Sequence, residues 1–188
     1  GVALPITRPS PHAWSVSGHA GRVRVTYRIF GDRIDGTYLA IDSTHAHINM
    51  PAALMWARGF EDRPVAIQFV APTGADWRVG TQLLPGADAS TFTAPNLQYL
   101  MDSPTELSAF DLRTFSPGDA PESPLVRVAV HHEGTDADVD GFAGDVERIV
   151  LEAERVFGEY PAFDDNSYTL IVDSLPWASG DGMEHRNS

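Results

Sequence analysis

Short stretches of alternating apolar and polar residues, separated by turn residues, occupy the chain from residue 21 to residue 130. The most regular stretch is 22–30, where every second residue from Val23 to Ile29 is apolar and most of the others are Arg or Thr. A period of two predicts a half-buried antiparallel strand. Clusters of Pro and Gly separate the other predicted strands, which are 37–41, 65–70, 77–83, 90–93 and 125–131. Residues 47–56 are compatible with a short helix.

The pattern changes near residue 134, where apolar residues begin to recur every three or four positions. This spacing predicts a helix over 139–157, with Asp138 or Asp140 as its N-cap and Gly158 after its end. A strongly apolar strand is predicted at 167–173. We therefore expect a mainly β chain, with an antiparallel β-sandwich-like N-terminal domain at 1–134 and the first helix and strands of an α/β domain at 135–188.

Composition excludes several classes of partner and site. The formal net charge is −13, and all 13 basic residues are Arg, so no basic stripe is available to neutralise nucleic-acid phosphates. No apolar run approaches the roughly 18 residues of a membrane helix, so we expect no membrane partner. The absence of Cys excludes disulfides and thiolate metal sites. The compartment, periplasmic or cytoplasmic, stays open.

Two histidine motifs are candidates for chemistry. His45 and His47 lie two residues apart, so a strand would place both imidazoles on one face, a spacing that can chelate zinc. Only Asp42 is near in sequence as a further ligand, and a hydrogen-bonding pair at a strand end is the favoured interpretation. His131 and His132 are adjacent, so a strand would point them to opposite faces, which favours structural or solvent-facing roles.

The motifs of the common hydrolases are missing. The chain has no HExxH sequence, which supplies two zinc ligands and a general base, and no Gly-x-Ser-x-Gly elbow. Asp102-Ser103-Pro104 predicts an Asx-type turn. The segment 180–188 combines two glycines with an acid, Glu184, beside a titratable base, His185.

This tail carries a resemblance to a known family. Gly-Met-Glu-His-Arg-Asn-Ser at 182–188, preceded by Tyr-Thr-Leu-Ile-Val-Asp at 168–173, resembles the segment upstream of the zinc helix in the glycyl aminopeptidases of metallopeptidase family 61. These are thermolysin-like zinc enzymes that also carry a PDZ domain. The resemblance extends to Phe-Thr-Ala-Pro-Asn-Leu-Gln-Tyr-Leu-Met-Asp-Ser-Pro at 92–104 and Val-Thr-Tyr-Arg-Ile-Phe at 25–30, and so covers nearly the whole chain.

The resemblance implies that this chain is the N-terminal portion of an aminopeptidase with a glycine-type preference. The first strands of the β domain would be missing, and residues 135–188 would be the truncated start of the catalytic domain. Zinc and its ligands would belong to the parent enzyme beyond Ser188, so the chain alone is expected to hold no metal and to be inactive. Its partners would be the peptide substrate, the rest of the catalytic domain and the PDZ domain.

The resemblance also assigns substrate contacts. Glu184 would hold the free α-ammonium of the substrate, while Gly182 and Met183 would offer backbone groups to it as an added strand. His185 stands where related aminopeptidases carry Asn, which leaves its role open. Gln98 or Asp102 would face the same site from the β domain.

Two other functions remain to be weighed. A free-standing β-sandwich could bind carbohydrate or protein through Trp14, Trp56 or Trp77, and a different hydrolase could use His45 and His47. The predicted helix at 139–157 should cover its apolar face against a catalytic-domain sheet that is mostly missing. We therefore expect it to pack on the β domain or, by self-association, on a second copy of the chain.

Overall fold

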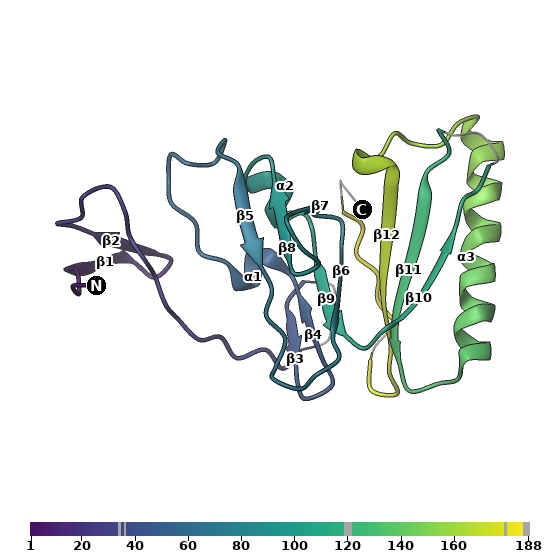
Figure 1. Ribbon diagram of the computed structural model, residues 1–188, viewed down its shortest axis with the longest axis horizontal. Helices are drawn as coiled ribbons and strands as arrows, with labels where there is room; N and C mark the ends of the chain where they lie inside the picture. Colours follow the sequence, from purple (N-terminus) through teal and green to yellow (C-terminus); the bar gives the residue numbers. More distant parts are fainter. Residues whose placement is uncertain (34, 36, 119–121, 179, 186–188) are drawn as a thin grey trace.

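A computed structural model of the chain describes residues 1–33, 35, 37–118, 122–178 and 180–185. Parts of the predicted turns at 31–36 and 121–124, and Arg186 to Ser188 of the tail, lie outside the described residues. The described chain is mainly β, with several antiparallel sheets. Figure 1 shows the sheets as successive layers, with one long helix, α3, at the far edge from the N-terminus.

The N-terminal segment forms a hairpin and then a run, residues 22–30, that pairs with no strand among the described residues, although the Tyr27 hydroxyl donates to the Ala53 carbonyl. Strands β1 (Ile6–Ser10) and β2 (Ala13–Val16) pair antiparallel. The predicted strand at 22–30 is wrong, because these residues are exposed and join no sheet in the described structure, with Phe30 79% exposed. The alternation of apolar residues is real, but a strand also needs a neighbour for its backbone groups. Figure 1 shows this segment extending away from the body of the chain.

Two antiparallel sheets form the middle of the molecule. The first has the order β3 (Leu39–Ile41), β4 (His45–Ile48), β9 (Thr105–Ser108) and β6 (Arg78–Thr81). The second has the order β5 (Val65–Gln68), β8 (Thr91–Ala94) and β7 (Leu84–Pro85). The strands predicted at 37–41, 65–70, 77–83 and 90–93 are confirmed, with boundary shifts. Their shared core includes Met50, Leu83, Ala94, Leu100 and Leu107.

The helical prediction at 47–56 is only partly right. Helix α1 covers Met50–Ala53, while His47 and Ile48 belong to β4 and pair with β9. Pro51 lies in the first turn of α1, where its missing N–H is harmless. A second short helix, α2 (Leu97–Met101), begins after Asn96, whose side chain accepts a hydrogen bond from the backbone N–H of Tyr99.

The last third of the chain forms a separate sheet with its own helix. Strand β10 (Asp111–Phe115) pairs antiparallel with β11 (Leu125–His132), and β11 pairs parallel with β12 (Ser167–Ser174). Helix α3 (Asp136–Phe157) connects the two parallel strands. The strands predicted at 125–131 and 167–173 are confirmed, and β12 has a partner sheet within this chain.

Helix α3 begins three residues earlier than the apolar spacing predicts. Its N-cap is Thr135, not Asp138 or Asp140. The Thr135 hydroxyl accepts from the N–H of Asp138, and the Asp138 carboxylate accepts from the N–H of Thr135, which forms a capping box. Asp138 and Asp140 therefore lie inside the helix. Gly158 ends it in a left-handed conformation with φ 84°.

One face of the sheet β10–β11–β12 packs against α3. Val126, Val128 and Val130 of β11 are buried against Val139 and Val146 of the helix. This corrects the expectation that the partner sheet of the helix would be mostly missing. Further along the helix the apolar residues Ile149, Val156 and Phe157 remain exposed. Among the described residues, none of the helices combines the length and the apolar character needed to cross a membrane.

The other face of this sheet packs against the sheet β3–β4–β9–β6 (Figure 1). The two layers approach closely at Gly80, where an added Cβ would lie 3.3 Å from the Cβ of Ala129. Polar contacts cross the interface, because the Thr169 hydroxyl donates to the Thr81 carbonyl and the Gln82 amide donates to the Ser167 carbonyl. The interface between the two layers is therefore polar, and the candidate site lies within it.

Candidate functional site at the interface of two sheets

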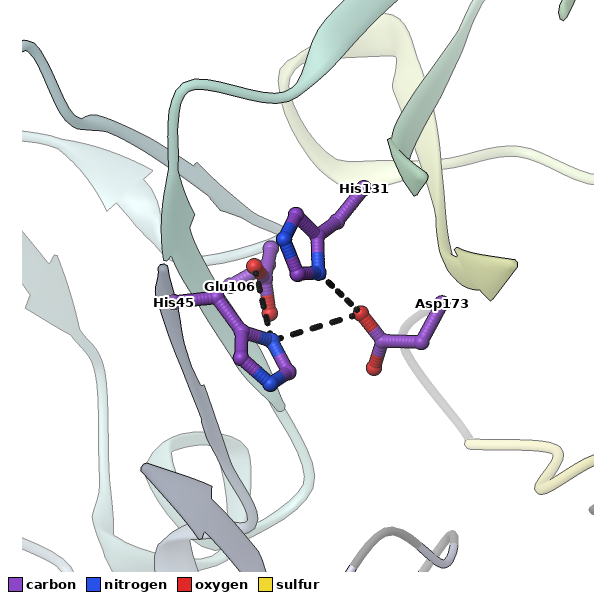
Figure 2. A group of neighbouring side chains, drawn as sticks. All are labelled: His45, Glu106, His131 and Asp173. Carbon is purple, nitrogen blue, oxygen red and sulfur yellow. Dashed lines mark ion pairs between the residues drawn. The ribbon is translucent and has the colours of Figure 1, made fainter. Parts of the chain in front are cut away.

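Five titratable side chains from four strands meet between the two layers. His45 and His47 come from β4, Glu106 from β9, His131 from β11 and Asp173 from β12. Strand register places them in pairs, since His47 lies opposite Glu106 in one sheet and His131 lies opposite Asp173 in the other. We call this group the interlayer cluster. Four of its members are drawn in Figure 2, converging from both sheets.

The alternation of strand β11 selects which histidine enters the cluster. Val126, Val128 and Val130 face helix α3, so His131, an odd-numbered position, faces the opposite sheet. His132 turns the other way, and its Nε2 lies 2.8 Å from the Asp111 carboxylate of β10. The two rings thus point to opposite faces as predicted. His131, with a side chain only 12% exposed, is not solvent-facing.

The contacts in the interlayer cluster are mostly longer than charge-assisted hydrogen bonds. His45 Nδ1 lies 3.4 Å from Glu106 Oε1 and 3.5 Å from Asp173 Oδ1. His131 Nδ1 lies 3.4 Å from the same oxygen of Asp173. Only His47 Nδ1 approaches closely, at 2.9 Å from Asp173 Oδ2. Charge-assisted N–H···O bonds are about 2.7–2.9 Å long, so three of these four contacts are too long for one. His47 Nδ1, although close to Asp173, is also a buried atom without a hydrogen-bond partner among the described residues, so all four contacts are ion pairs without hydrogen-bond geometry.

Burial makes these long contacts notable. His45 and Glu106 are fully buried, and Asp173 is nearly so. Among the buried side-chain atoms without a hydrogen-bond partner are both nitrogens of His45, both oxygens of Glu106, His131 Nδ1 and Asp173 Oδ1. Unsatisfied buried polar atoms are uncommon in folded proteins because each costs about 1–3 kcal/mol. This concentration at one point marks a special environment.

The charges of the cluster shift one another's pKa values. Burial disfavours a charged His45, yet the Asp173 and Glu106 carboxylates outweigh burial and raise the pKa of His45 to about 10. The same opposing causes raise the pKa of His47 to about 9. Burial disfavours the charged forms of Asp173 and Glu106, but the facing imidazoles hold the pKa of both carboxyls below the usual range.

A cavity opens beside the cluster and is bounded by the C-terminal tail. Its volume is about 220 Å³, and its walls include His47, Asn49, Pro104, residues 168–173 of β12, Asp181, Gly182, Met183 and His185. The tail returns from the end of β12 and passes over this cavity. The predicted substrate residues Gly182, Met183 and His185 therefore line it, whereas Glu184 is exposed and is not among the lining residues.

The tail also contacts the loop that follows α2. His185 Nδ1 lies 3.3 Å from Asp102 Oδ1, although the two residues are 83 positions apart in sequence. Asp102 and Gln98 line a second, shallower hollow together with Pro51 and Met101. The structure thus brings His185 to Asp102, while Gln98 lies at a neighbouring surface.

Comparison with known proteins gives the family. The family profile described as the peptidase M61 N-terminal domain matches residues 1–109, which end between β9 and β10. The chain belongs to this family. No curated protein matches the chain.

A solved structure shares the fold of the whole chain. It is a crystal structure of an aminopeptidase N family protein from Idiomarina loihiensis, with a TM-score of 0.79 and 22% sequence identity. The match covers 100% of this chain and 31% of that protein. The chain therefore spans about a third of the length of this structural relative.

Of the three tryptophans expected as stacking platforms, two are accessible. Trp14 is 48% exposed on β2, and Trp56 is 52% exposed after α1. Trp77 instead packs against the core of the middle sheets. The Arg8 guanidinium lies over the Trp14 ring at 5.2 Å. A common binding face for all three is thus not formed.

Sequence reasoning found part of the interlayer cluster and missed the rest. The spacing of His45 and His47 indicates a possible metal site, but their sequence neighbourhood offers no clear third ligand. For His131 the sequence predicts only a structural or solvent-facing role. Glu106 and Asp173 escaped attention altogether. The sequence did contain a signal for these two acids. Each of their strands has one carboxylate among uncharged residues, Glu106 in Thr-Glu-Leu-Ser and Asp173 at the end of an apolar run. A single acid in a strand that is otherwise buried indicates a polar site, because a buried charge needs a partner.

Proposed function

We propose that this chain is the N-terminal part of a zinc-dependent aminopeptidase that removes N-terminal residues from peptides, with a preference for glycine. The family match and the shared fold support a peptidase-related role. The chain contains no HExxH sequence, so the catalytic zinc would be held by residues outside this sequence. In this proposal residues 135–188 begin the catalytic domain, and a PDZ domain belongs to the parent protein.

The observation that carries the proposal is the contact between the tail and the β domain. His185 lies against Asp102, and Gly182 and Met183 line a small cavity with residues of β4 and β12. An aminopeptidase must recognise the free amine end of its substrate, and in this proposal the exposed Glu184, between the cavity-lining residues Met183 and His185, would do so at the mouth of the cavity. A cavity of about 220 Å³ bounded by the tail is small, which suits a small first residue.

The proposed roles follow from the chemistry of each group. The exposed Glu184 carboxylate would pair with the substrate α-ammonium, a charge-assisted contact stronger than a neutral hydrogen bond. The backbone of Gly182 and Met183 would pair with the substrate as an added strand. Asp102 would hold His185 and thereby fix the tail over the cavity, with Gln98 further from the amine.

This function is favoured over the two alternatives by specific observations. Membership in a peptidase family that accounts for residues 1–109 argues against a free-standing carbohydrate- or protein-binding module. A hydrolase centred on His45 and His47 would need substrate access, yet His45 is fully buried. His45 would therefore be out of reach of a substrate in the cavity, although His47 lines the cavity wall.

The test is Glu184→Gln in the parent enzyme, with free and N-acetylated peptides as substrates. Loss of a charge-assisted contact should lower kcat/KM for the free amine substrate about 10–100-fold, with zinc content unchanged. Discrimination against the acetylated peptide should fall by the same factor, because both substrates then lack the ion pair.

The matched control is Glu159→Gln, which removes an exposed carboxylate that does not line the cavity and should leave both values unchanged. If Glu184→Gln retains full discrimination between the two peptides, the assignment of the amine to Glu184 is wrong. If His185→Ala changes neither KM nor kcat, the tail contact to Asp102 has no part in substrate binding.

A further inference from the structure

The interlayer cluster carries an inference that is independent of the proposed peptidase function. We propose that His45, Glu106, His131 and Asp173 form a closed structural site for a divalent transition-metal ion of the zinc class, held between the two sheets. The donor atoms are His45 Nδ1, Glu106 Oε1, His131 Nδ1 and Asp173 Oδ1. Figure 2 shows these side chains directed toward a common centre from four different strands.

The spacing of the donor atoms supports a metal over hydrogen bonds. Zinc bonds to nitrogen and oxygen ligands are about 2.0–2.1 Å long, so the edges of a tetrahedral site are about 3.3–3.4 Å. Three of the six distances among these donors are 3.4, 3.5 and 3.4 Å. All four donor atoms lie within 4.8 Å of one another, so small side-chain rotations suffice to close the set around one ion.

The four proposed donor atoms are all among the buried atoms left without hydrogen-bond partners, as are His45 Nε2, His47 Nδ1 and Glu106 Oε2 of the same cluster. Each of them is buried and unsatisfied in the described structure. An ion at the centre of the four donors would satisfy those four at once, and a dication would balance the two carboxylates. Two imidazoles with two carboxylates are a donor set that zinc accepts, and the chain has no Cys to offer a softer one.

His47 supplies the outer contacts that such sites require. Its Nδ1 lies 2.9 Å from Asp173 Oδ2 and 3.6 Å from Glu106 Oε2, the oxygens of the two carboxylates that are not proposed as ligands. Asp42 Oδ2 lies 3.9 Å from His45 Nε2, on the far side of that ring, which is too far for a hydrogen bond. Outer-shell partners of this kind orient metal ligands and raise metal affinity.

Burial assigns the ion a structural role. Four protein ligands without an open position are typical of structural zinc, whereas catalytic zinc keeps a position for water. The site would fasten strands β4 and β9 of one sheet to β11 and β12 of the other. Asp173 also lies just before the tail that bounds the cavity, so the ion would fix the point from which the tail departs.

The experiment uses the full 188-residue chain, which contains no HExxH and therefore cannot report on a catalytic zinc. The chain is stripped with a chelator, titrated with zinc by calorimetry, and heated with and without the metal. We expect one equivalent of tightly bound zinc and a rise in Tm that grows with zinc concentration. X-ray absorption of the loaded chain should show only nitrogen and oxygen at about 2.0 Å, with imidazole scattering.

Neighbouring histidines provide a matched pair of variants. His131→Ala removes a proposed ligand and should lower zinc affinity at least 100-fold. His132→Ala changes the adjacent residue, which faces Asp111 on the other side of the strand, and should leave affinity unchanged. His47→Gln should weaken binding about 10–100-fold while keeping one equivalent, as expected for an outer contact.

Three results would overturn the proposal. The first is a wild-type chain that binds no zinc, which would leave the cluster as a set of protonated imidazoles between carboxylates. The second is equal zinc affinity in the His131 and His132 variants, which would place the ion elsewhere. The third is an absorption spectrum of the wild-type chain without imidazole scattering, a measurement that does not depend on any variant folding.

Discussion

The two faces of the sheet β10–β11–β12 are built on opposite principles. The face toward α3 is apolar, with Val126, Val128 and Val130 buried against valines of the helix. The face toward the other sheet carries Arg127, Ala129 and His131 from the same strand, and its neighbours include buried Thr, Ser, Gln and Glu side chains. One strand thus takes part in two interfaces of nearly opposite chemistry.

The apolar interface with α3 and the polar interface between the sheets differ in how they contribute to stability and to specificity. Apolar burial is non-directional, so the helix face tolerates changes of shape as long as volume is kept. Buried charges are stable only when every partner is in place, because an unpaired one is strongly unfavourable. The apolar face therefore stabilises the packing of α3 on the sheet without requiring one exact geometry. The interlayer cluster, by contrast, fixes one relative position of the two sheets.

The largest effect is expected from removing one carboxylate of the interlayer cluster. Glu106→Ala should lower the free energy of unfolding by about 3–5 kcal/mol, because it leaves the buried imidazoles of His45 and His47 with Asp173 as their one remaining close carboxylate in the cluster. Urea unfolding of the metal-free chain measures this. Glu133→Ala, which removes an exposed carboxylate at the end of β11, is the control. A loss below 1 kcal/mol for Glu106→Ala would show that the cluster contributes no specificity to the interface.

A second effect is expected from alkaline pH, and it acts on the polar interface between the two sheets. The folded pKa values of His45 and His47 are raised to about 10 and about 9, above the ordinary value of about 6.5. Their contribution is complete below pH 6.5 and is lost as pH rises through 9 to 10. The metal-free chain should therefore lose stability between pH 7 and pH 10.

Thermal unfolding from pH 6 to pH 10 in a chelator measures this loss. A variant with His45 and His47 both changed to Gln should have lower stability at pH 7 and a flatter profile. A profile as steep as that of the wild-type chain would assign the alkaline loss to other groups. In acid the lowered pKa values of Glu106 and Asp173 predict a second loss, as pH falls below the ordinary carboxyl range.

The smallest effect is expected on the apolar face. Val128 is fully buried, and Val128→Ala removes two methyl groups, which should cost about 2 kcal/mol. The loss should be nearly independent of pH, because no titratable group of the interlayer cluster lies on that face. Unfolding at pH 7 and pH 9 tests both statements together. A pH-dependent cost would mean that the two interfaces are coupled through the strand.

Much of the fold can be predicted from local patterns. The helix period after residue 134 gives α3, and short apolar runs between turn residues give β3, β5, β6, β8, β11 and β12. Residues 22–30 show the limit, since their alternation is the most regular in the chain and yet they join no sheet among the described residues. Pairing depends on which segment lies alongside, and the pattern of one segment carries no such information.

The site was less predictable than the fold, for a related reason. The tail Gly182 to His185 and the loop at Asp102 were chosen on sequence, but their contact is a property of the folded chain. In the interlayer cluster, His45 and His47 share a face because they are two residues apart. Glu106, His131 and Asp173 are far apart in sequence and meet only through strand register and the stacking of two sheets.

The sequence by itself determined which segments are helix or strand in most of the chain, the polarity of each strand face, and the resemblance to a peptidase family. Those properties depend on residues within a few positions of one another. The tertiary structure decided which polar faces meet, and therefore that three histidines and two acids share one buried volume. Burial makes these contacts important, because charged groups removed from water are stable only when they are paired. Only the fold determines which partners are within reach.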